Sequence, residues 1–303
     1  MGHLGIKFWG TRGLVSSPSP DVAKYGGNTT CLEIIGAHNT DDEISIVDTG
    51  FGACKLGEKL MQAAFASGRS LTINIFYTHF HWDHTQGLPF FHPIYLPDTK
   101  IKIYSPVAPA LTKENLDILF DGSYSPFSGI DSMPSQIEFV QLKQNDKIGN
   151  LAVEFAPVDH GRELTNQLVL PTYAYKFSIN SSSSVGILTD HEARPSHCNQ
   201  ALIELMQKVD ILIHDGQFTD AEYKSHVGWG HSSLSQALDN ILACKAKLGI
   251  LTHHAPGRSD AEIDLLQKNN RNIKKYKNLT FGFAEEDRVY LVESSKKLAK
   301  QAS

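Results

Sequence analysis

Short apolar runs rich in β-branched residues recur along the chain and predict β-strands. Gly, Pro, Asn or Asp bounds each run, as is usual at strand ends. The runs read LGIKFWG, CLEIIG, ISIVDTG, LTINIFYTH, IKIYSP, IEFVQL, LAVEFAPVDH, YAYKFSI, VGILTD, DILIHD, LGILTHH and RVYLVE.

Apolar residues at helical spacing lie between several of these runs and predict helices. The predicted helices cover Lys55 to Ala66, Asn199 to Val209, Leu234 to Cys244 and Ala261 to Gln267. Ser259 and Asp260 precede the last of them, where an N-cap residue is expected. Residues 112–134 contain Gly and Pro, which predicts a short helix followed by a loop that edges a site. Strands with helices between them favour an α/β sandwich of two sheets with helices outside.

Composition and charge narrow the class of protein. The chain has 303 residues, of which 41% are hydrophobic, and a net charge of −5. This acidic balance argues against long-range attraction to nucleic acid or to an anionic membrane. No apolar run reaches the roughly 18 residues that a bilayer span requires. The four cysteines lie far apart and the N-terminus lacks an apolar leader, so we expect a cytoplasmic protein with reduced thiols.

The stretch YTHFHWDHTQG, residues 77–87, follows a predicted strand and concentrates residues that bind metals. Alternate residues of an extended segment point the same way, so His79 and His81 can bind one ion. Asp83 and His84 follow after a turn and can face a second ion. Imidazole nitrogens and carboxylate oxygens suit zinc, manganese or iron.

Further polar side chains end apolar runs elsewhere in the chain: Asp48, His79, His160, Asp190, Asp215 and His253. Ligands of α/β folds gather where strand ends meet loops. His160 and Asp190 can therefore complete the coordination begun by the histidine stretch, and Asp190 has two oxygens with which to bridge two ions. The alternative is a surface patch, or core histidines satisfied by hydrogen bonds. It does not explain why so many of these residues stand at the ends of predicted strands.

The stretch THFHWDH matches the H-x-H-x-D-H signature of the metallo-β-lactamase superfamily, and the chain resembles these binuclear metallohydrolases over nearly its whole length. FWGTRG and KYGGNTTC resemble the opening of the branch that includes ribonuclease Z, cyclic-nucleotide phosphodiesterases and cyclic-phosphate hydrolases of phosphonate metabolism. VDTG, ILTD, LIHDGQF, GWGHSS and LTHH resemble its later motifs in order. The resemblance implies one domain over residues 1–303, a four-layer αββα sandwich of two mixed β-sheets.

The resemblance also implies two divalent ions, zinc first, with manganese or iron as alternatives. One ion would be held by His79, His81 and His160, the other by Asp83, His84 and His253, with Asp190 bridging. His253 is preferred to His254 as the ligand because it directly follows LGILT, and His254 is expected to support the ligands or to contact the substrate. Side chains of neighbouring residues on a strand point in opposite directions, so only one of these two histidines is expected to bind the ion.

Other positions receive roles around this centre. Asp48 either orients the ligand loop or simply forms a turn. Asp215 and His231, with Asp83, are the candidate catalytic residues, and an aspartate oriented against an imidazole could protonate a leaving oxygen. Asp215 is one methylene shorter than the glutamate of ribonuclease Z, so its contact with His231 stays open. Asn28 and Thr29 could approach a phosphate through backbone N–H groups.

The expected function is a metal-dependent phosphodiesterase that acts on a small substrate, such as a 3′,5′-cyclic nucleotide, with a hydroxide held between two metals. An alternative is a ribonuclease Z-like endonuclease that processes tRNA 3′ ends, but no basic arm for gripping tRNA is found. A non-catalytic metal-binding module is the alternative from another class, and it predicts missing ligands. The partner expected is a small phosphodiester, without nucleic acid or membrane, and homodimerisation is left open.

Overall fold

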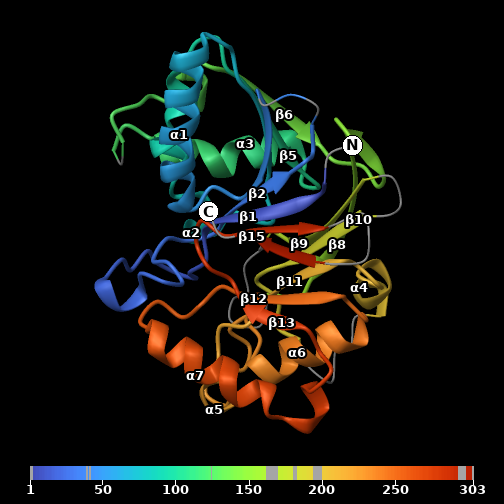
Figure 1. Ribbon diagram of the computed structural model, residues 1–303. Helices are drawn as coiled ribbons and strands as arrows, with labels where there is room; N and C mark the ends of the chain where they lie inside the picture. The colour runs from blue at the N-terminus through green and yellow to red at the C-terminus, as the bar shows by residue number, and fades with distance from the viewer. Residues whose placement is uncertain are drawn as a thin grey trace.

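The computed structural model describes the chain except for residues 1–2, 39, 41, 124, 162–169, 180–182, 194–199, 293–297 and 302–303. The described part forms four layers, with two sheets packed face to face and helices on both outer sides (Figure 1). This is the αββα sandwich that the sequence resemblance implies.

The first sheet contains eight strands among the described residues, in the order β15-β14-β1-β2-β3-β4-β5-β6. Neighbouring strands are antiparallel from β15 to β3 and parallel from β3 to β6. Their bounds are β1 Gly5–Gly10, β2 Cys31–Ile35, β3 Glu43–Val47, β4 Thr72–Phe76, β5 Lys100–Ser105, β6 Gln136–Gln141, β14 Val289–Val292 and β15 Leu298–Gln301.

The second sheet contains seven strands among the described residues, in the order β13-β12-β11-β10-β9-β8-β7. Strands β10 to β13 are parallel neighbours, whereas β7 to β10 alternate in direction. Their bounds are β7 Asp146–Ile148, β8 Leu151–Val158, β9 Thr172–Ile179, β10 Ser183–Leu188, β11 Ile211–Asp215, β12 Leu248–Thr252 and β13 Phe281–Phe283. Every predicted strand is present; β7, β13 and β15, of three or four residues each, were missed because such short segments show no clear periodicity.

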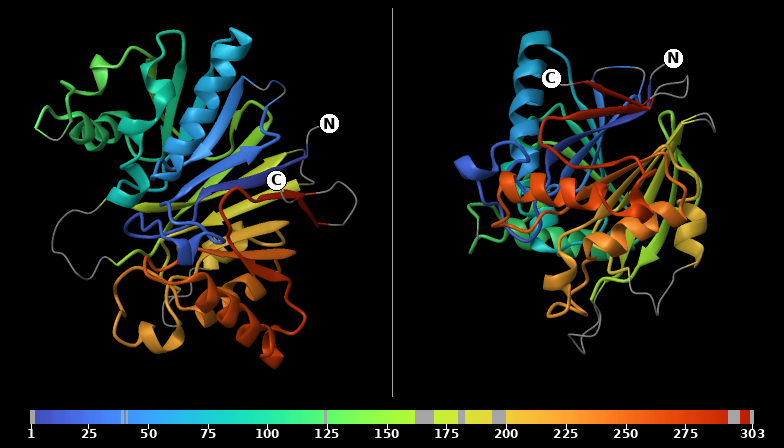
Figure 2. Two further views of the ribbon diagram at one scale, coloured as in Figure 1. Left: turned by 60° about the vertical axis from the view of Figure 1, so that its left-hand side comes forward. Right: turned by 60° about the horizontal axis from the view of Figure 1, so that its bottom comes forward.

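The helices of the described residues are α1 Gly52–Ser67, α2 Trp82–Thr85, α3 Pro109–Asp117, α4 Gln200–Leu205, α5 Asp220–Tyr223, α6 Leu234–Ala243 and α7 Asp260–Arg271. The longer helices α1, α3, α6 and α7 lie on the outer faces of the two sheets (Figure 2). The predicted start of α7 is confirmed by a capping box. The Ser259 side chain accepts the N–H of Glu262, and the Glu262 carboxylate accepts the N–H of Ser259. The predicted helix ending at Val209 is too long, since the chain leaves α4 and turns at Lys208 with a φ of 58°.

Apolar side chains fill three interfaces between these layers. Phe76 of β4 contacts Phe177 of β9 across the two sheets, with ring centroids 5.1 Å apart. A second cluster lies between α1, α3 and the first sheet, and a third between α6, α7 and the second sheet. Within the described ranges, none of the helices has both the length and the apolar character needed to cross a membrane.

Candidate metal centre

The carboxyl ends of strands from both sheets meet at one edge of the sandwich. His79 follows β4 of the first sheet, whereas His160, Asp190 and His253 follow β8, β10 and β12 of the second. Strand β8 runs in the same direction as β10, because both are antiparallel to β9. The parallel strands of each sheet therefore deliver polar residues to the same edge.

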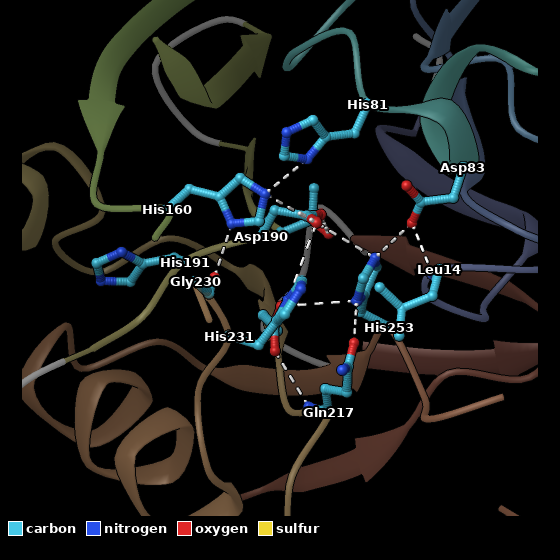
Figure 3. A network of polar contacts seen from close by, with 12 residues as sticks. Leu14, His81, Asp83, His160, Asp190, His191, Gln217, Gly230, His231 and His253 are labelled. Carbon is cyan, nitrogen blue, oxygen red and sulfur yellow. Dashed lines mark hydrogen bonds and ion pairs between the residues drawn. The ribbon is translucent and has the colours of Figure 1, made fainter. Parts of the chain in front are cut away.

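His79, His81 and His160 form a first group that can hold a metal ion, with one ring nitrogen from each lying within 4.8 Å of the others. His160 Nε2 lies 3.0 Å from His81 Nδ1 (Figure 3). Burial lowers the pKa of His79 well below its ordinary value, that of His160 to about 4, and that of His81 as well. Neutral imidazoles have a lone pair to offer, so this group is prepared for a cation.

Asp83, His84, Asp190 and His253 form a second group of the same kind, and all four are buried. His84 Nε2 lies 3.1 Å from one oxygen of Asp190, and His253 Nε2 lies 3.1 Å from an oxygen of Asp83. His253 Nε2 is also 3.3 Å from the other oxygen of Asp190.

Asp190 lies between the two groups. Its Oδ1 is 3.9 Å from His79 Nε2 and 3.7 Å from His160 Nε2, while its Oδ2 faces His84. This is the position that a bridging carboxylate needs.

Three buried atoms at the centre support a cation there: His79 Nε2, His84 Nε2 and Asp190 Oδ1. None of them makes a well-aligned hydrogen bond in the described part of the chain, although His84 Nε2 and Asp190 Oδ1 each lie close to an oppositely charged group. A buried polar group left unsatisfied costs about 1–3 kcal/mol, more if it is charged. Divalent cations would satisfy all three atoms, so the residues present fit a metal centre.

Carboxylates and imidazoles of the second group lie close enough to shift one another's pKa. Burial alone would raise the pKa of Asp190, but His253 and His84 lower it well below the ordinary value. Burial alone would lower the pKa of His253, but Asp190 and the hydrogen bond to Asp83 raise it to about 9. Protonated imidazoles thus balance the buried carboxylates, and a bound cation would take over this charge balance.

Hydrogen bonds to the second nitrogen fix the ring orientation of several histidines. His84 Nδ1 donates to Asp48 at 2.7 Å, and Asp48 also accepts the N–H and the hydroxyl of Thr78. His253 Nδ1 donates to Gln217 Oε1 at 2.9 Å. Such bonds turn Nε2 toward the centre. The geometry supports the orienting role predicted for Asp48.

The backbone is strained where three of these side chains leave their strands. Asp48, Asp190 and His253 have φ values of 60°, 53° and 60°, in the left-handed region. Non-glycine residues in such conformations cost on the order of 1–3 kcal/mol each and persist where the surroundings impose them. Each residue directly or nearly follows a strand, so the left-handed turn aims its side chain at the centre.

His254 faces away from the metal centre. Its Nε2 donates to the carbonyl oxygen of Ala284 at 2.9 Å, and its ring packs edge-on against Tyr25. His253 points inward instead, since its Nε2 lies 3.1 Å from Asp83 and 3.3 Å from Asp190. The geometry therefore favours His253 as the ligand, in agreement with the choice made from sequence.

Asp215 and His231 are in direct contact. Asp215 Oδ2 lies 2.7 Å from His231 Nδ1, and Oδ1 accepts the N–H groups of Gln217 and Ser232. The His231 ring stacks on that of His253, with centroids 4.8 Å apart. The carboxylate of Asp215 therefore reaches His231, which answers the question that the sequence left open.

Asn28 and Thr29 do not offer N–H groups to a phosphate as predicted. The backbone N–H of Asn28 donates to Glu286 at 2.6 Å. Thr29 is fully buried, and its hydroxyl accepts the N–H of Phe51 and the amide of Gln86. The loop that contains the paired glycines therefore binds other parts of the protein. Thr29 connects the residue before α1 to the residue after α2.

Sequence reasoning missed residues that hold the ligands in place. Glu192 is buried and accepts the Tyr223 hydroxyl at 2.6 Å and the N–H groups of Gly228 and Gly230 at 2.9 and 3.1 Å. The carbonyl oxygen of Gly230 in turn accepts His160 Nδ1 at 2.8 Å (Figure 3). The only signal was its position two residues after Asp190, in TDHE.

Leu14 is another residue that the sequence did not single out. Its backbone N–H donates to Asp83 Oδ2 at 2.8 Å, and its φ is 65°. The preceding Gly13 packs so closely on His253 that a Cβ there would lie 2.3 Å from the imidazole ring. The N-terminal loop therefore supports both Asp83 and His253.

Comparison with solved structures supports the fold. Yeast PDE1, unliganded, superposes with a TM-score of 0.70 at 16% identity, covering 97% of this chain and 100% of that one. A diphosphatase from the PhnP family gives 0.62 at 19% identity, with 98% and 100% covered. The short form of human tRNase Z gives 0.58 at 21% identity, with 94% and 98% covered. The TM-scores show that these proteins share the fold, and at identities this low the likeness concerns the fold alone.

Sequence comparison identifies the family. No curated protein sequence matches the chain. Residues 46–254, however, match the beta-lactamase superfamily domain. The matched span contains both metal-binding groups and the pair formed by Asp215 and His231. The chain belongs to the beta-lactamase superfamily.

Proposed function

We propose that this chain is a hydrolase that uses two divalent metal ions to cleave phosphodiesters. The position of Asp190 carries the proposal, because one buried carboxylate faces both groups of nitrogen and oxygen ligands. The structures that share the fold include a PDE1, a PhnP-family diphosphatase and a tRNase Z, which supports phosphoester chemistry.

His79, His81 and His160 would hold one ion, and Asp83, His84 and His253 the other, with Asp190 between them. Bound there, two ions supply Lewis acidity, a lowered pKa for coordinated water and neutralisation of charge on the phosphoryl oxygens. The ligand types suit zinc, with manganese and iron as alternatives.

The chain's own contribution to proton transfer comes from His231. With Nδ1 held by Asp215, its Nε2 is the nitrogen left to exchange a proton with the substrate. Asp215 orients the ring, and an imidazole in this position can carry a proton on Nε2 to a leaving oxygen. The pair thus has the arrangement of a general acid and the residue that orients it.

A small substrate, such as a 3′,5′-cyclic nucleotide, fits the charge of the chain better than a nucleic acid does. The net charge of −5 would repel a polyanion, whereas one phosphate can be neutralised locally by the two ions. Precursor tRNA serves as the discriminating probe.

The test is metal analysis followed by a substrate panel. Protein loaded separately with zinc and manganese is expected to contain about two ions per chain. It is expected to hydrolyse bis(p-nitrophenyl) phosphate and a cyclic nucleotide. An Asp190→Asn variant should lose metal and at least about 1,000-fold in rate, since both sites depend on this residue. Phe65→Ala, an exposed aromatic truncation on α1, is the matched control and should keep both properties.

Two results would contradict the proposal. Two bound ions without hydrolysis of any phosphodiester would favour a non-catalytic metal-binding module. Efficient cleavage of precursor tRNA together with inactivity toward small diesters would favour the tRNA-processing alternative.

A further inference from the structure

An apolar pocket lies against helix α2, the helix that carries Asp83 and His84. Its volume is about 270 Å³, and it is lined by Phe51, Trp82, Gln86, Pro89, Phe90, Ile118, Leu119 and Ser125. Helix α2 and the residues after it form one wall, and residues that follow α3 form the other. The latter belong to the segment for which the sequence predicted a loop that edges a site.

The lining has the chemistry of a binding site for an uncharged ring. Among the described residues that line it, none is charged, and only Gln86 and Ser125 are polar. Trp82, Phe90 and Ile118 leave 62%, 58% and 58% of their surface exposed. Large apolar side chains left open to water around a concavity mark a binding surface. A dry cavity of about 150 Å³ already accepts benzene, so this pocket has room for a substituted ring.

Helix α2 connects the pocket to the metal centre. Trp82 and Gln86 are four residues apart and lie on the same side of this short turn, which faces the pocket. Asp83 and His84, the intervening residues, are buried and face the metal-binding groups. Trp82 directly precedes Asp83 in the chain, so one turn of helix carries both a wall residue of the pocket and a residue of the second metal-binding group.

Resting on the proposed phosphodiesterase function, we propose that this pocket binds an uncharged aromatic or heteroaromatic group of the substrate. The phosphoryl group would lie at the metal centre, and the ring would pack on Trp82 and Phe90. Phe90 is itself held in place, because its ring stacks on Phe51 with centroids 6.2 Å apart and an interplanar angle of 17°. The pocket thereby selects among phosphodiesters by their organic group.

The first test keeps the leaving group constant. Phenyl p-nitrophenyl phosphate and methyl p-nitrophenyl phosphate differ only in the group that remains on phosphorus. The wild-type protein is expected to prefer the phenyl ester in kcat/KM by about tenfold, as burial of a ring in an apolar pocket predicts. Trp82→Ala and Phe90→Ala should each remove most of this preference by lowering kcat/KM for the phenyl ester toward that for the methyl ester. Phe65→Ala, exposed on α1, should retain the preference.

The second test does not depend on turnover. Calorimetric titration of the metal-loaded protein with phenylphosphonate and with methylphosphonate should show about tenfold tighter binding of the phenyl compound. The difference should vanish in Trp82→Ala, whose metal content should equal that of the wild type.

The outcomes separate the pocket from the catalytic proposal. Hydrolysis of phosphodiesters without phenyl preference in rate or binding would overturn the pocket assignment alone. Phenyl preference in binding without hydrolysis would support the pocket and overturn the proposed function. A wild-type dimer by light scattering that Trp82→Ala converts to a monomer would show that a second copy occupies the pocket, and would overturn the assignment to substrate.

Discussion

At the residue scale, the pairing of His231 with Asp215 gives the sharpest prediction. His231→Ala should keep its metal content but lose about 10²–10⁴-fold in kcat for a cyclic nucleotide, whose leaving alkoxide needs a proton. The loss should be small for bis(p-nitrophenyl) phosphate, because p-nitrophenolate leaves without protonation. Steady-state kinetics on both substrates measure the difference. Equal losses on both would rule out a general-acid role for His231.

Asp215→Asn refines this prediction. The amide oxygen can still accept from His231 Nδ1, which Asp215 contacts at 2.7 Å, but the negative charge next to the ring is removed. The variant is expected to show the same leaving-group dependence as His231→Ala with a smaller loss. Full activity of this variant toward the cyclic nucleotide would show that Asp215 has a structural role in its loop and none in proton transfer.

At the element scale, the loop at residues 228–230 links His160, a candidate metal ligand, to the buried carboxylate of Glu192. Gly230 has a φ of 87°, and a Cβ there would lie 2.4 Å from His160 Nδ1. The glycine therefore allows the loop to approach the histidine, and Glu192 holds the loop through two N–H groups. The position of this loop therefore sets the orientation of the His160 ring.

Glu192→Gln is expected to weaken metal binding at the group formed by His79, His81 and His160. An amide cannot accept at both of its terminal atoms, so the N–H of either Gly228 or Gly230 loses its partner. Outer hydrogen bonds of this kind typically contribute about 10–100-fold in metal affinity. Competition with a chelator should show one weakened site and one unchanged site. Tyr223→Phe, which removes only a hydroxyl bonded to the same carboxylate, is the matched control. Equal weakening at both sites would contradict the prediction.

At the scale of the whole molecule, a tyrosine buried in the core between the two sheets is expected to make the free energy of unfolding fall at alkaline pH. Tyr104 of β5 is buried and stacks on Phe76, with centroids 5.0 Å apart. Burial, together with Glu138 and Glu43, raises its pKa to about 12. An unfolded tyrosine ionises near pH 10, so the unfolded chain loses this proton first. The associated stability is therefore fully present below pH 10 and is lost as the pH rises toward 12.

The measurable consequence is a difference between the wild type and Tyr104→Phe. Between pH 9 and pH 11 the wild type should lose about 1 kcal/mol more unfolding free energy than the variant, which keeps the ring but has no proton to lose. Urea titrations of the metal-free proteins at the two pH values provide the measurement. Parallel losses in both proteins would show that Tyr104 does not ionise differently on unfolding.

The sequence predicted the strands, the sandwich and the cluster of metal-binding residues because each depends on local spacing. Alternation of apolar residues gave the strands, and H-x-H-x-D-H placed His79, His81, Asp83 and His84 together. It could not predict that the N–H of Asn28 is taken by Glu286, because these residues are 258 positions apart. Nor could it predict the support of His160 by Glu192, which passes through Gly230, 38 positions away.

By itself, then, the sequence determined which residue types stand at strand ends and how neighbours alternate, since both follow from backbone geometry over a few residues. Only the tertiary structure decided which of His253 and His254 faces the centre. It also decided that Asp215 reaches His231, and that Trp82 borders a pocket. Those outcomes depend on how loops from two sheets approach one another in space, and distances across a folded chain are not encoded in local periodicity.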